Sequence, residues 1–248
     1  MNLSIIRYDT VESTNTEATK QAKLGADAGL CIIAGEQTAG RGRHGRTWVS
    51  EKDSGLYFSI VLRPKLESRF LPLITLMTGV AVHDTLKEFG IGPDIKWVND
   101  ILVAEKKISG ILAETVETPT GLAIVVGIGV NLTSRNFPDE IADTATSMEA
   151  ETGKRILPDE LAEVLTGYLS YFYDILSNGD GPFEILRHWQ QRSSYFSDKP
   201  VRVTLDGIVI DGVTDGLEEN GALRVKTVGG SVKIVQAGDV ERLRPNYE

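Results

Sequence analysis

The stretch IKWVNDILVAEKKISGILAETVETPTGLAIVVGIGVNL (95–132) decides the fold, because it contains three successive strand patterns joined by very short turns. The runs IKWVNDILVAE, KKISGILAETVE and LAIVVGIGVNL are rich in β-branched side chains, which favour strands. The joints, at Glu105–Lys106 and within ETPTG (117–121), are so short that neighbouring strands must be antiparallel. We therefore predict an antiparallel meander at the centre of an α+β fold with a mixed or antiparallel sheet.

Helices and further strands are expected on either side of this meander. Residues 69–90 have apolar side chains at helical spacing and end at Gly90, which predicts a long core helix. Near the N-terminus, Thr14 and Glu17 have capping-box spacing, and Gly25 is a suitable C-terminal stop. The remaining predicted elements are strands at 3–11, 30–37 and 56–64, and helices at 15–24, 157–177 and 183–191.

The character of the sequence changes near residues 193–198. From Lys199 onward, short β-branched runs alternate with glycine-containing turns, which is typical of small antiparallel proteins. A stretch of roughly 50 residues is the size of an SH3-like barrel. We therefore predict two domains: a main α+β domain over residues 1–195 and a small C-terminal SH3-like β-barrel over residues 196–248.

The charge and composition narrow the range of functions. Lys and Arg number 26 against 35 Asp and Glu, so the formal net charge is −9. An acidic protein repels nucleic acid and anionic membranes at long range, although this charge is compatible with a local basic patch. The single cysteine, Cys31, cannot form an internal disulfide, and the sequence has neither a signal peptide nor an apolar run of membrane-spanning length. A cytoplasmic protein with no membrane partner is therefore expected.

A basic, glycine-rich segment, TAGRGRHGRTW (38–48), stands out in this acidic chain. Its glycines predict a loop, and its four basic side chains are Arg41, Arg43, His44 and Arg46. Glycines allow close backbone approach, and guanidinium groups bind phosphate or carboxylate in a bidentate manner. The composition favours an anion-binding loop, and it leaves open a solvated basic turn or a nucleic-acid-binding segment.

The segment KWVND places polar and aromatic side chains on alternating faces of the predicted strand. In a continuous strand, Lys96, Val98 and Asp100 share one face, whereas Trp97 and Asn99 share the other.

Asp100 is the candidate for chemistry in this segment. Near a strand end it could hold Mg²⁺ or accept a proton. Antiparallel pairing can bring Lys107, at the start of the returning strand, close to Asp100. The alternative is an ordinary surface ion pair, which contributes about 0–1 kcal/mol. The residue types alone favour that alternative, and they favour core positions for Trp48 and Trp97.

Two further segments carry polar or glycine signals. Ser13 or Thr14 in ESTN is explained as a helix N-cap, and a helix N-terminus also suits an anionic ligand group. Gly127 and Gly129 in VVGIGVNL weaken a strand unless something approaches it closely, and Asn131 at its end could face a ligand. The sequence contains no zinc-ligand spacing, nucleophile elbow or P-loop.

Taken together and in this order, ESTN, GRGRHGRTW, KWVNDI, KKISGILAE and GIGVNL resemble the pattern of biotin–protein ligases, also called biotin–[carboxylase] ligases. Each segment alone is weak, but five in the correct order are specific. The resemblance runs from Leu3 to Leu243 and includes the small C-terminal β domain. Two positions depart from the family pattern: Val98 stands where many relatives have proline, and His44 where many have arginine.

The resemblance implies a catalytic domain similar to class II aminoacyl-tRNA synthetases, followed by an SH3-like domain. It also implies two reactions. Biotin and ATP, with Mg²⁺, form biotinyl-5′-adenylate and pyrophosphate, and the adenylate then biotinylates one lysine of a biotin carboxyl carrier protein domain. The ligands of the metal ion stay unknown at this point.

The family's site residues carry over to matching positions of this chain. Lys107 resembles the lysine that contacts the biotin carboxylate and the α-phosphate. The resemblance implies catalytic roles for Lys107, Arg43, Arg41 and Asp100. It implies a biotin site made of Ser13, Thr14, Gln37, Gly40, Arg41, Arg43, Lys107, Gly110 and Ile111. It implies an ATP site made of Arg43, Arg46, Trp48, Asn99, Asp100, Lys107 and Asn131.

Three other functions fit parts of the sequence. A lipoate–protein ligase uses related chemistry, but this chain has the GRGRHGRTW loop instead of an SGGG-type run. A non-catalytic biotin sensor would not need Lys107 and Asp100, and a nucleic-acid-binding module would use the arginine loop.

The family also sets expectations about partners. Since the catalytic pattern starts by Ser13, we expect the monofunctional type, without an N-terminal DNA-binding domain and without operator binding. A homodimer is compatible with the family. Binding of the acceptor domain is expected through β-strand pairing and complementary charge.

Overall fold

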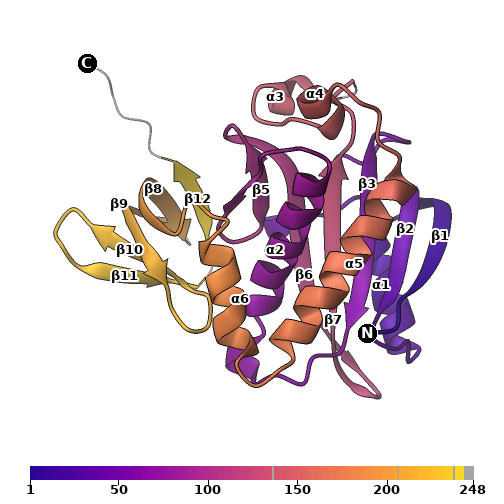
Figure 1. The fold of residues 1–248 in the computed structure, drawn as a ribbon, viewed down its shortest axis with the longest axis horizontal. Coiled ribbons are helices and arrows are strands. Elements are labelled where there is room, and N and C mark those ends of the chain that lie inside the picture. The colour runs from indigo at the N-terminus through magenta and orange to yellow at the C-terminus, as the bar shows by residue number, and fades with distance from the viewer. Residues whose placement is uncertain (136, 206, 237, 243–248) are drawn as a thin grey trace.

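The computed structural model of the chain describes residues 1–135, 137–205, 207–236 and 238–242, and two β-sheets form its framework (Figure 1). The larger sheet has seven strands in the order β1-β2-β3-β7-β6-β5-β4, and the smaller has five in the order β11-β10-β9-β8-β12. β1 and β2 are parallel, whereas the other neighbours in the larger sheet are antiparallel. The predicted α+β class with a mixed sheet is therefore confirmed. Residues 243–248, at the end of the predicted C-terminal domain, lie outside the described residues.

The larger sheet contains the predicted meander. Its strands are β1 (Ser4–Val11), β2 (Leu30–Gln37), β3 (Gly55–Leu62), β4 (Asp94–Lys96), β5 (Asp100–Val103), β6 (Lys106–Thr118) and β7 (Gly121–Asn131). The turn between β5 and β6 lies at Ala104–Glu105, one residue earlier than predicted, and both residues have positive φ. A two-residue turn with positive φ at both positions matches the twist of a β-hairpin.

The prediction of one continuous strand over residues 95–105 is wrong. The chain turns at residues 97–99, so that β4 and β5 run antiparallel with Lys96 opposite Asp100. Lys96 and Asp100 still share a face, because they are directly opposite in the antiparallel pair, but Val98 lies in the turn, where regular alternation stops. The turn directs the buried Trp97 toward the second sheet, where its indole N–H donates to the Gly221 carbonyl at 2.9 Å.

Helices cover both faces of the larger sheet. α1 (Thr14–Lys23) packs on one face, and α2 (Leu73–Glu88), α5 (Pro158–Leu176) and α6 (Gly181–Gln190) form a layer on the other, as Figure 1 shows. The strands accordingly bury apolar side chains on both sides. Ile32, Val61 and Val125 pack against Ala18 and Ala22 of α1, while the neighbouring Ile33, Ile60 and Val126 belong to the core on the opposite face.

All four predicted helices form, and each begins one to four residues away from its predicted start. The α-helical part of 69–90 begins at Leu73, after Pro72 and a short 3₁₀ turn at Ser68–Phe70. The first helix begins at Thr14, and the expected Thr14–Glu17 capping box does not form, because the Thr14 backbone N–H donates to Gln37 instead. The short helices α3 (Asp139–Ala142) and α4 (Met148–Thr152) were not predicted.

The second sheet contains β8 (Ser197–Leu205), β9 (Ile208–Leu217), β10 (Leu223–Thr227), β11 (Val232–Val235) and β12 (Asp239–Arg242). All of its neighbouring strands are antiparallel, as predicted from the glycine-spaced runs. It joins the first sheet through the Trp97–Gly221 hydrogen bond and a 3.0 Å ion pair between Lys199 and Glu105. Among the described residues, no helix is long and apolar enough to cross a membrane.

An ionic cluster fixes the helical layer to the segment that leads into the second sheet. Arg192 donates two hydrogen bonds, of 2.7 and 2.8 Å, to the Asp84 carboxylate, and His83 lies 2.9 Å from the same group. Burial alone would raise the pKa of Asp84, but hydrogen bonds and charge from His83 and Arg192 outweigh it and lower the pKa to about 2. The ionised carboxylate therefore stabilises the folded protein.

We expect Asp84→Asn to lower the free energy of unfolding by about 2 kcal/mol at neutral pH, the energy that corresponds to lowering the pKa from 3.8 to about 2. Because the folded pKa lies below the unfolded one, this stabilisation is complete above about pH 4 and is lost as the pH falls through about 2. Chemical denaturation of both proteins across this pH range measures it. Asp211→Asn, which breaks an exposed pair with Arg202, is the control and should change little. A deficit for Asp84→Asn that persists undiminished at pH 2 would contradict the assignment.

Candidate active site

Three glycines in adjacent strands form an open floor on the face of the larger sheet that carries α1. Gly110 of β6 lies opposite Gly129 of β7, with Gly127 two residues earlier on β7. A Cβ atom on Gly129 would lie 2.3 Å from Cε2 of Trp48, and one on Gly127 would lie 2.2 Å from Oδ1 of Asn15. The close approach predicted from these glycines is confirmed, and Trp48 and Asn15 are the side chains that make it.

A polar network surrounds one end of this floor. The backbone N–H and the hydroxyl of Thr14 donate to Oε1 of Gln37 at 2.8 and 3.1 Å, and the Gln37 amide donates to Ser50 Oγ at 2.7 Å. Ser13, Thr14 and Asn15 are each only 3% exposed. Buried hydroxyl and amide groups beside an open floor can fix the orientation of a small polar ring.

The segment 38–48 is a loop that lies across the floor, as predicted. The backbone N–H of Trp48 donates to the Gly40 carbonyl at 3.0 Å, and the backbone N–H of Gly42 donates to the Arg46 carbonyl at 2.7 Å. These two bonds fold the loop back on itself. Gly40 is required there, because a Cβ atom would lie 2.3 Å from the Trp48 carbonyl oxygen. His44, at the tip, has a φ of 54°, in the left-handed region. These contacts place the basic side chains around the edge of the pocket.

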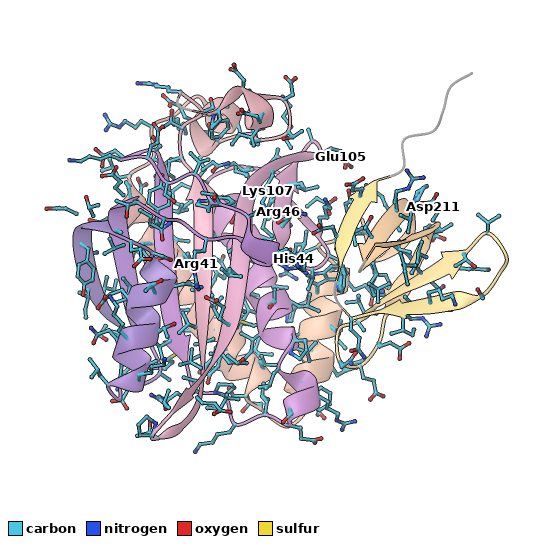
Figure 2. All side chains as sticks on the ribbon, turned by 180° about the vertical axis from the view of Figure 1, so that it is seen from behind. Arg41, His44, Arg46, Glu105, Lys107 and Asp211 are labelled. Carbon is cyan, nitrogen blue, oxygen red and sulfur yellow. The ribbon has the colours of Figure 1, made fainter. Side chains whose placement is uncertain are left out.

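Each arginine of this loop already has a partner within the protein. Arg41 pairs with Glu114 of β6, Arg46 pairs with Asp239 of β12, and Arg43 donates to the Asn99 side-chain oxygen at 2.7 Å. Figure 2 shows Arg46 and His44 on the side of the loop next to the second sheet, with Arg41 on the opposite side. Burial lowers the pKa of Arg43, and the nearby carboxylates of Asp239 and Asp100 oppose this effect. The loop therefore presents a cluster of ordered cations, not a freely solvated basic turn.

Lys107 lies between the polar network and a second, more apolar pocket. Its Nζ is 2.6 Å from Oδ1 of Asp100 and 5.4 Å from the centre of the Trp48 ring. The predicted proximity of Lys107 to Asp100 is thus confirmed, although the strand register places Gly110 opposite Asp100, and the place of Lys107 in the pockets argues against the surface-pair alternative. The buried Trp48 indole N–H has no hydrogen-bond partner within the described parts of the chain. A polar ligand atom would satisfy this donor.

The second pocket lies on the far side of Trp48 and Lys107. Asn131 lines it, and its amide donates to the carbonyl oxygens of Thr146 and Lys107 at 3.0 and 3.4 Å. The apolar wall contains Val49, Tyr57, Phe137, Ile141 and Ala145. Trp48 and Lys107 line both pockets, so that ligands in the two pockets would meet there.

The structure brings most of the residues that the sequence singled out to one pocket. Asn131 lines the second pocket instead, Gly40 and Arg46 line neither of the two, and Asp100 reaches the site through its ion pair with Lys107. Ser13, Thr14, Gln37, Arg41, Arg43, Trp48, Asn99, Lys107 and Gly110 line the first pocket. Ile111 contributes only its backbone to this pocket. Its side chain points to the opposite face of the sheet, toward α2, and lies near Gly79. The Ile111 backbone instead forms two hydrogen bonds with Asn99, of 2.9 and 3.0 Å.

Sequence reasoning missed several residues of the site. Asn15 donates to Glu114 at 2.8 Å and lies 2.6 Å from the Ser59 hydroxyl. Asn15 belongs to the quoted ESTN motif and could have been noticed there, whereas Ser59, Glu114 and Asp239 carry no local signal. Among the described residues, no three His, Cys, Asp or Glu side chains gather to hold a metal ion.

Comparisons with known proteins point to one family. A profile of the Biotin/lipoate A/B protein ligase family matches residues 8–131, and one of the Biotin protein ligase C terminal domain matches residues 196–243. The Bifunctional ligase/repressor BirA of Bacillus subtilis is 34% identical over 246 residues, which cover 97% of this chain and 74% of that protein. The Biotin--[acetyl-CoA-carboxylase] ligase of Paracoccus denitrificans is 30% identical and covers 92% of this chain and 96% of its own length.

Solved structures agree with this similarity. The biotin protein ligase from Aquifex aeolicus in complex with biotin and ATP matches with a TM-score of 0.85 at 30% identity, covering 96% of this chain and 99% of that chain. The apo structure of the same protein matches with a TM-score of 0.81 at 27% identity.

We expect Gly129→Ala to displace the Trp48 indole, because the new Cβ would lie within 2.3–2.7 Å of three of its ring atoms. Overpacking of this kind costs about 1–3 kcal/mol, so the melting temperature should fall. Tryptophan emission should shift to longer wavelength as the indole meets water, since Trp97 and Trp189 stay buried.

Two controls make this measurement specific. Gly92→Ala adds a Cβ that meets nothing within 4 Å and should change neither quantity. In a Trp48→Phe background, Gly129→Ala should no longer shift the emission. Unchanged emission in Gly129→Ala alone would refute the close packing of Trp48 on the glycine floor.

Proposed function

Because the chain belongs to the Biotin/lipoate A/B protein ligase family, we propose that it is an ATP-dependent biotin–protein ligase acting on a biotin-accepting carboxylase domain. The observation that carries this proposal is the position of Lys107. Its side chain lines both a polar pocket, which Arg41 and Arg43 also line, and an apolar pocket. A ligase that joins an acid to a nucleotide needs two adjacent pockets and positive charge where they meet.

Biotin is proposed to occupy the polar pocket. Ser13, Thr14 and Gln37 supply the hydroxyl and amide groups that suit the ureido ring. Gly110 leaves room for the aliphatic chain above the sheet, and Gly40 lets the loop close over it. The backbone at Ile111 completes the wall, and the carboxylate would then point toward Arg41, Arg43 and Lys107.

ATP is proposed to occupy the second pocket. The Trp48 ring and the apolar wall suit the purine, and Asn131 holds the wall in place through its bonds to two carbonyl groups. Arg43, Arg46 and Lys107 are positioned for the phosphates, and Asn99 fixes the Arg43 guanidinium. Asp100 forms an ion pair with Lys107.

The first reaction joins two anions, and this chain's cations address that difficulty. A carboxylate oxygen of biotin attacks the α-phosphorus, and the bond to the leaving pyrophosphate breaks. Arg41, Arg43 and Lys107 reduce the repulsion between the reactants and stabilise charge on the phosphoryl oxygens. Mg²⁺ fits as a component of the substrate, because it is usually bound by substrate phosphates and one or two carboxylates, for which Asp100 is the candidate here.

The second reaction transfers biotin to the acceptor. The Nζ atom of the acceptor lysine attacks the carbonyl carbon of the adenylate, the bond to the phosphate oxygen breaks and AMP leaves. The lysine must lose a proton, and we propose that Asp100 orients or accepts it. Closure of the 38–48 loop over the adenylate would protect it from water.

The second half of β6 offers a place for the acceptor. β5 pairs with β6 only as far as Gly110, so among the described residues β6 keeps an unpaired edge beyond this point. An acceptor strand could add to such an edge, with charge complementarity near Glu114 and Arg41. A homodimer could use the same edge, which leaves the oligomeric state to experiment.

The finer organisation is also part of the proposal. We propose a class II synthetase-like catalytic domain over residues 1–195 and an SH3-like domain over residues 196–248, in a cytoplasmic enzyme that binds no DNA operator. The match of the C-terminal family profile to residues 196–243 supports that division.

The direct test is transfer of biotin to a purified carrier domain in the presence of ATP, with lipoate as a parallel substrate. We expect transfer of biotin alone. Lys107→Ala should reduce it by about 10²-fold or more, as expected for loss of a group that stabilises transition-state charge. The neighbouring, exposed Lys106→Ala is the matched control and should keep full activity. Biotin bound without transfer would indicate a sensor, and transfer of lipoate would indicate the related ligase.

Asp100→Asn tests the second reaction separately. We expect transfer from preformed adenylate to slow by about 10²-fold, because proton acceptance by a positioned group contributes at least that much. The variant's transfer rate should rise with pH as more of the acceptor lysine is neutral. Adenylate formation, measured by pyrophosphate release without acceptor, should fall much less. A full rate of transfer in this variant would remove the proposed role of Asp100.

A further inference from the structure

The second sheet touches the cations of the arginine loop directly. β12 begins at Asp239, and the Asp239 carboxylate pairs with Arg46. The carbonyl oxygen of the preceding residue, Gly238, lies 3.5 Å from Nη2 of Arg43. Residues almost two hundred positions away in sequence therefore contact the loop at its basic edge, next to the second sheet in Figure 2.

The Arg46 side chain forms an ion pair with the Asp239 carboxylate. Among the described residues, that side chain forms no other ion pair or side-chain hydrogen bond. Arg46 is also the most exposed of the three loop arginines, with 65% of its side chain accessible to solvent. Without Asp239, the guanidinium would have nothing in the described structure to hold it near the pocket.

The pair also reduces repulsion within the loop. The positive charge of Arg46 lowers the pKa of Arg43, and the negative charge of the Asp239 carboxylate raises it. A guanidinium carries five N–H donors in a rigid fork, so a carboxylate on one edge leaves other donors for phosphate oxygens. Asp239 can therefore hold Arg46 without competing for all of its hydrogen-bonding capacity.

A second contact connects the second sheet to the arginine loop, at the turn between β9 and β10. The Trp97 indole bonds to Gly221 of the second sheet, and Asn99, two residues further on, accepts from Arg43. The second sheet is thus fixed to the same β4–β5 turn that fixes Arg43.

We propose that Asp239 is a positioning residue of the nucleotide site, which presents the Arg46 guanidinium to the phosphates of ATP. This inference rests on the proposed function, because it assigns Arg46 to phosphate binding. Exposed ion pairs add little to folding stability. The effect of Asp239 should therefore be on ATP and not on folding or on biotin.

The test is steady-state kinetics of the full-length Asp239→Asn variant, in which the side chain keeps its shape and loses its charge. We expect the KM for ATP to rise about tenfold, the effect of losing one charge-assisted contact, while kcat at saturating ATP and the KM for biotin stay within twofold. Asp239→Glu should restore part of the ATP affinity. Asp211→Asn, which removes another exposed Asp–Arg pair from the same sheet, is the matched control and should leave all constants unchanged.

A double-mutant cycle shows whether Asp239 acts through Arg46. In an Arg46→Ala background, Asp239→Asn should change the KM for ATP by less than about twofold, because coupled residues are not additive. An unchanged KM for ATP in the single variant, or an equal effect in both backgrounds, would overturn the proposal.

Amide hydrogen exchange of the ligand-free protein separates this inference from the proposed function. We expect faster exchange at residues 42–46 in Asp239→Asn than in wild type or Asp211→Asn, since the loop loses its restraint. If wild type transfers no biotin, the proposed function fails, and the exchange rates still decide whether Asp239 holds the loop. Equal exchange in all three proteins would overturn the positioning role.

Discussion

The missing Cβ atoms of Gly110, Gly127 and Gly129 let side chains from distant parts of the chain lie directly against the face of the sheet. These glycines weaken the strands in which they lie, because glycine loses more backbone entropy on folding than other residues do. The sheet tolerates them at its centre, where β6 and β7 are paired from Ser109–Val130 to Thr118–Gly121 and α2 packs against β6. Trp48 and Asn15 occupy the space that the glycines leave. The position of the loop and of the first helix therefore depends on these three positions.

Charge balance follows from the same arrangement. Four cations converge on the pocket, and each has a partner on a different element: Glu114 for Arg41, Asn99 for Arg43, Asp239 for Arg46 and Asp100 for Lys107. Without these partners the cations would repel one another in a partly desolvated site. The partners lower the electrostatic cost of holding the four cations together in the ligand-free protein. An anionic ligand can exchange with some of these partners when it binds. A chain with a net charge of −9 can in this way maintain a local positive site.

Much of the fold could be predicted from local pattern alone. Short turns between β-branched runs identified β6 and β7, and the clustering of glycine with arginine identified the loop, because both signals lie within a few consecutive residues. The roles of individual site residues came from the family resemblance and remain predictions. The residues that were missed act over long sequence separations: Glu114 reaches Arg41, and Asp239 reaches Arg46. No local periodicity encodes such contacts, so only the folded chain shows them.

The error at residues 95–105 shows how the two sheets and the loop are connected. In a continuous strand, Trp97 and Asn99 would point to the same face and could contact only the part of the protein that lies on that face. The turn at 97–99 sends the Trp97 indole to Gly221 of the second sheet and the Asn99 amide to Arg43, and it brings Asp100 onto the strand beside Lys107. Three residues, Trp97, Asn99 and Asp100, thus contact the second sheet, the arginine loop and the lysine at the junction of the pockets. A regular strand would have gained ladder hydrogen bonds here and lost the connection between those three parts.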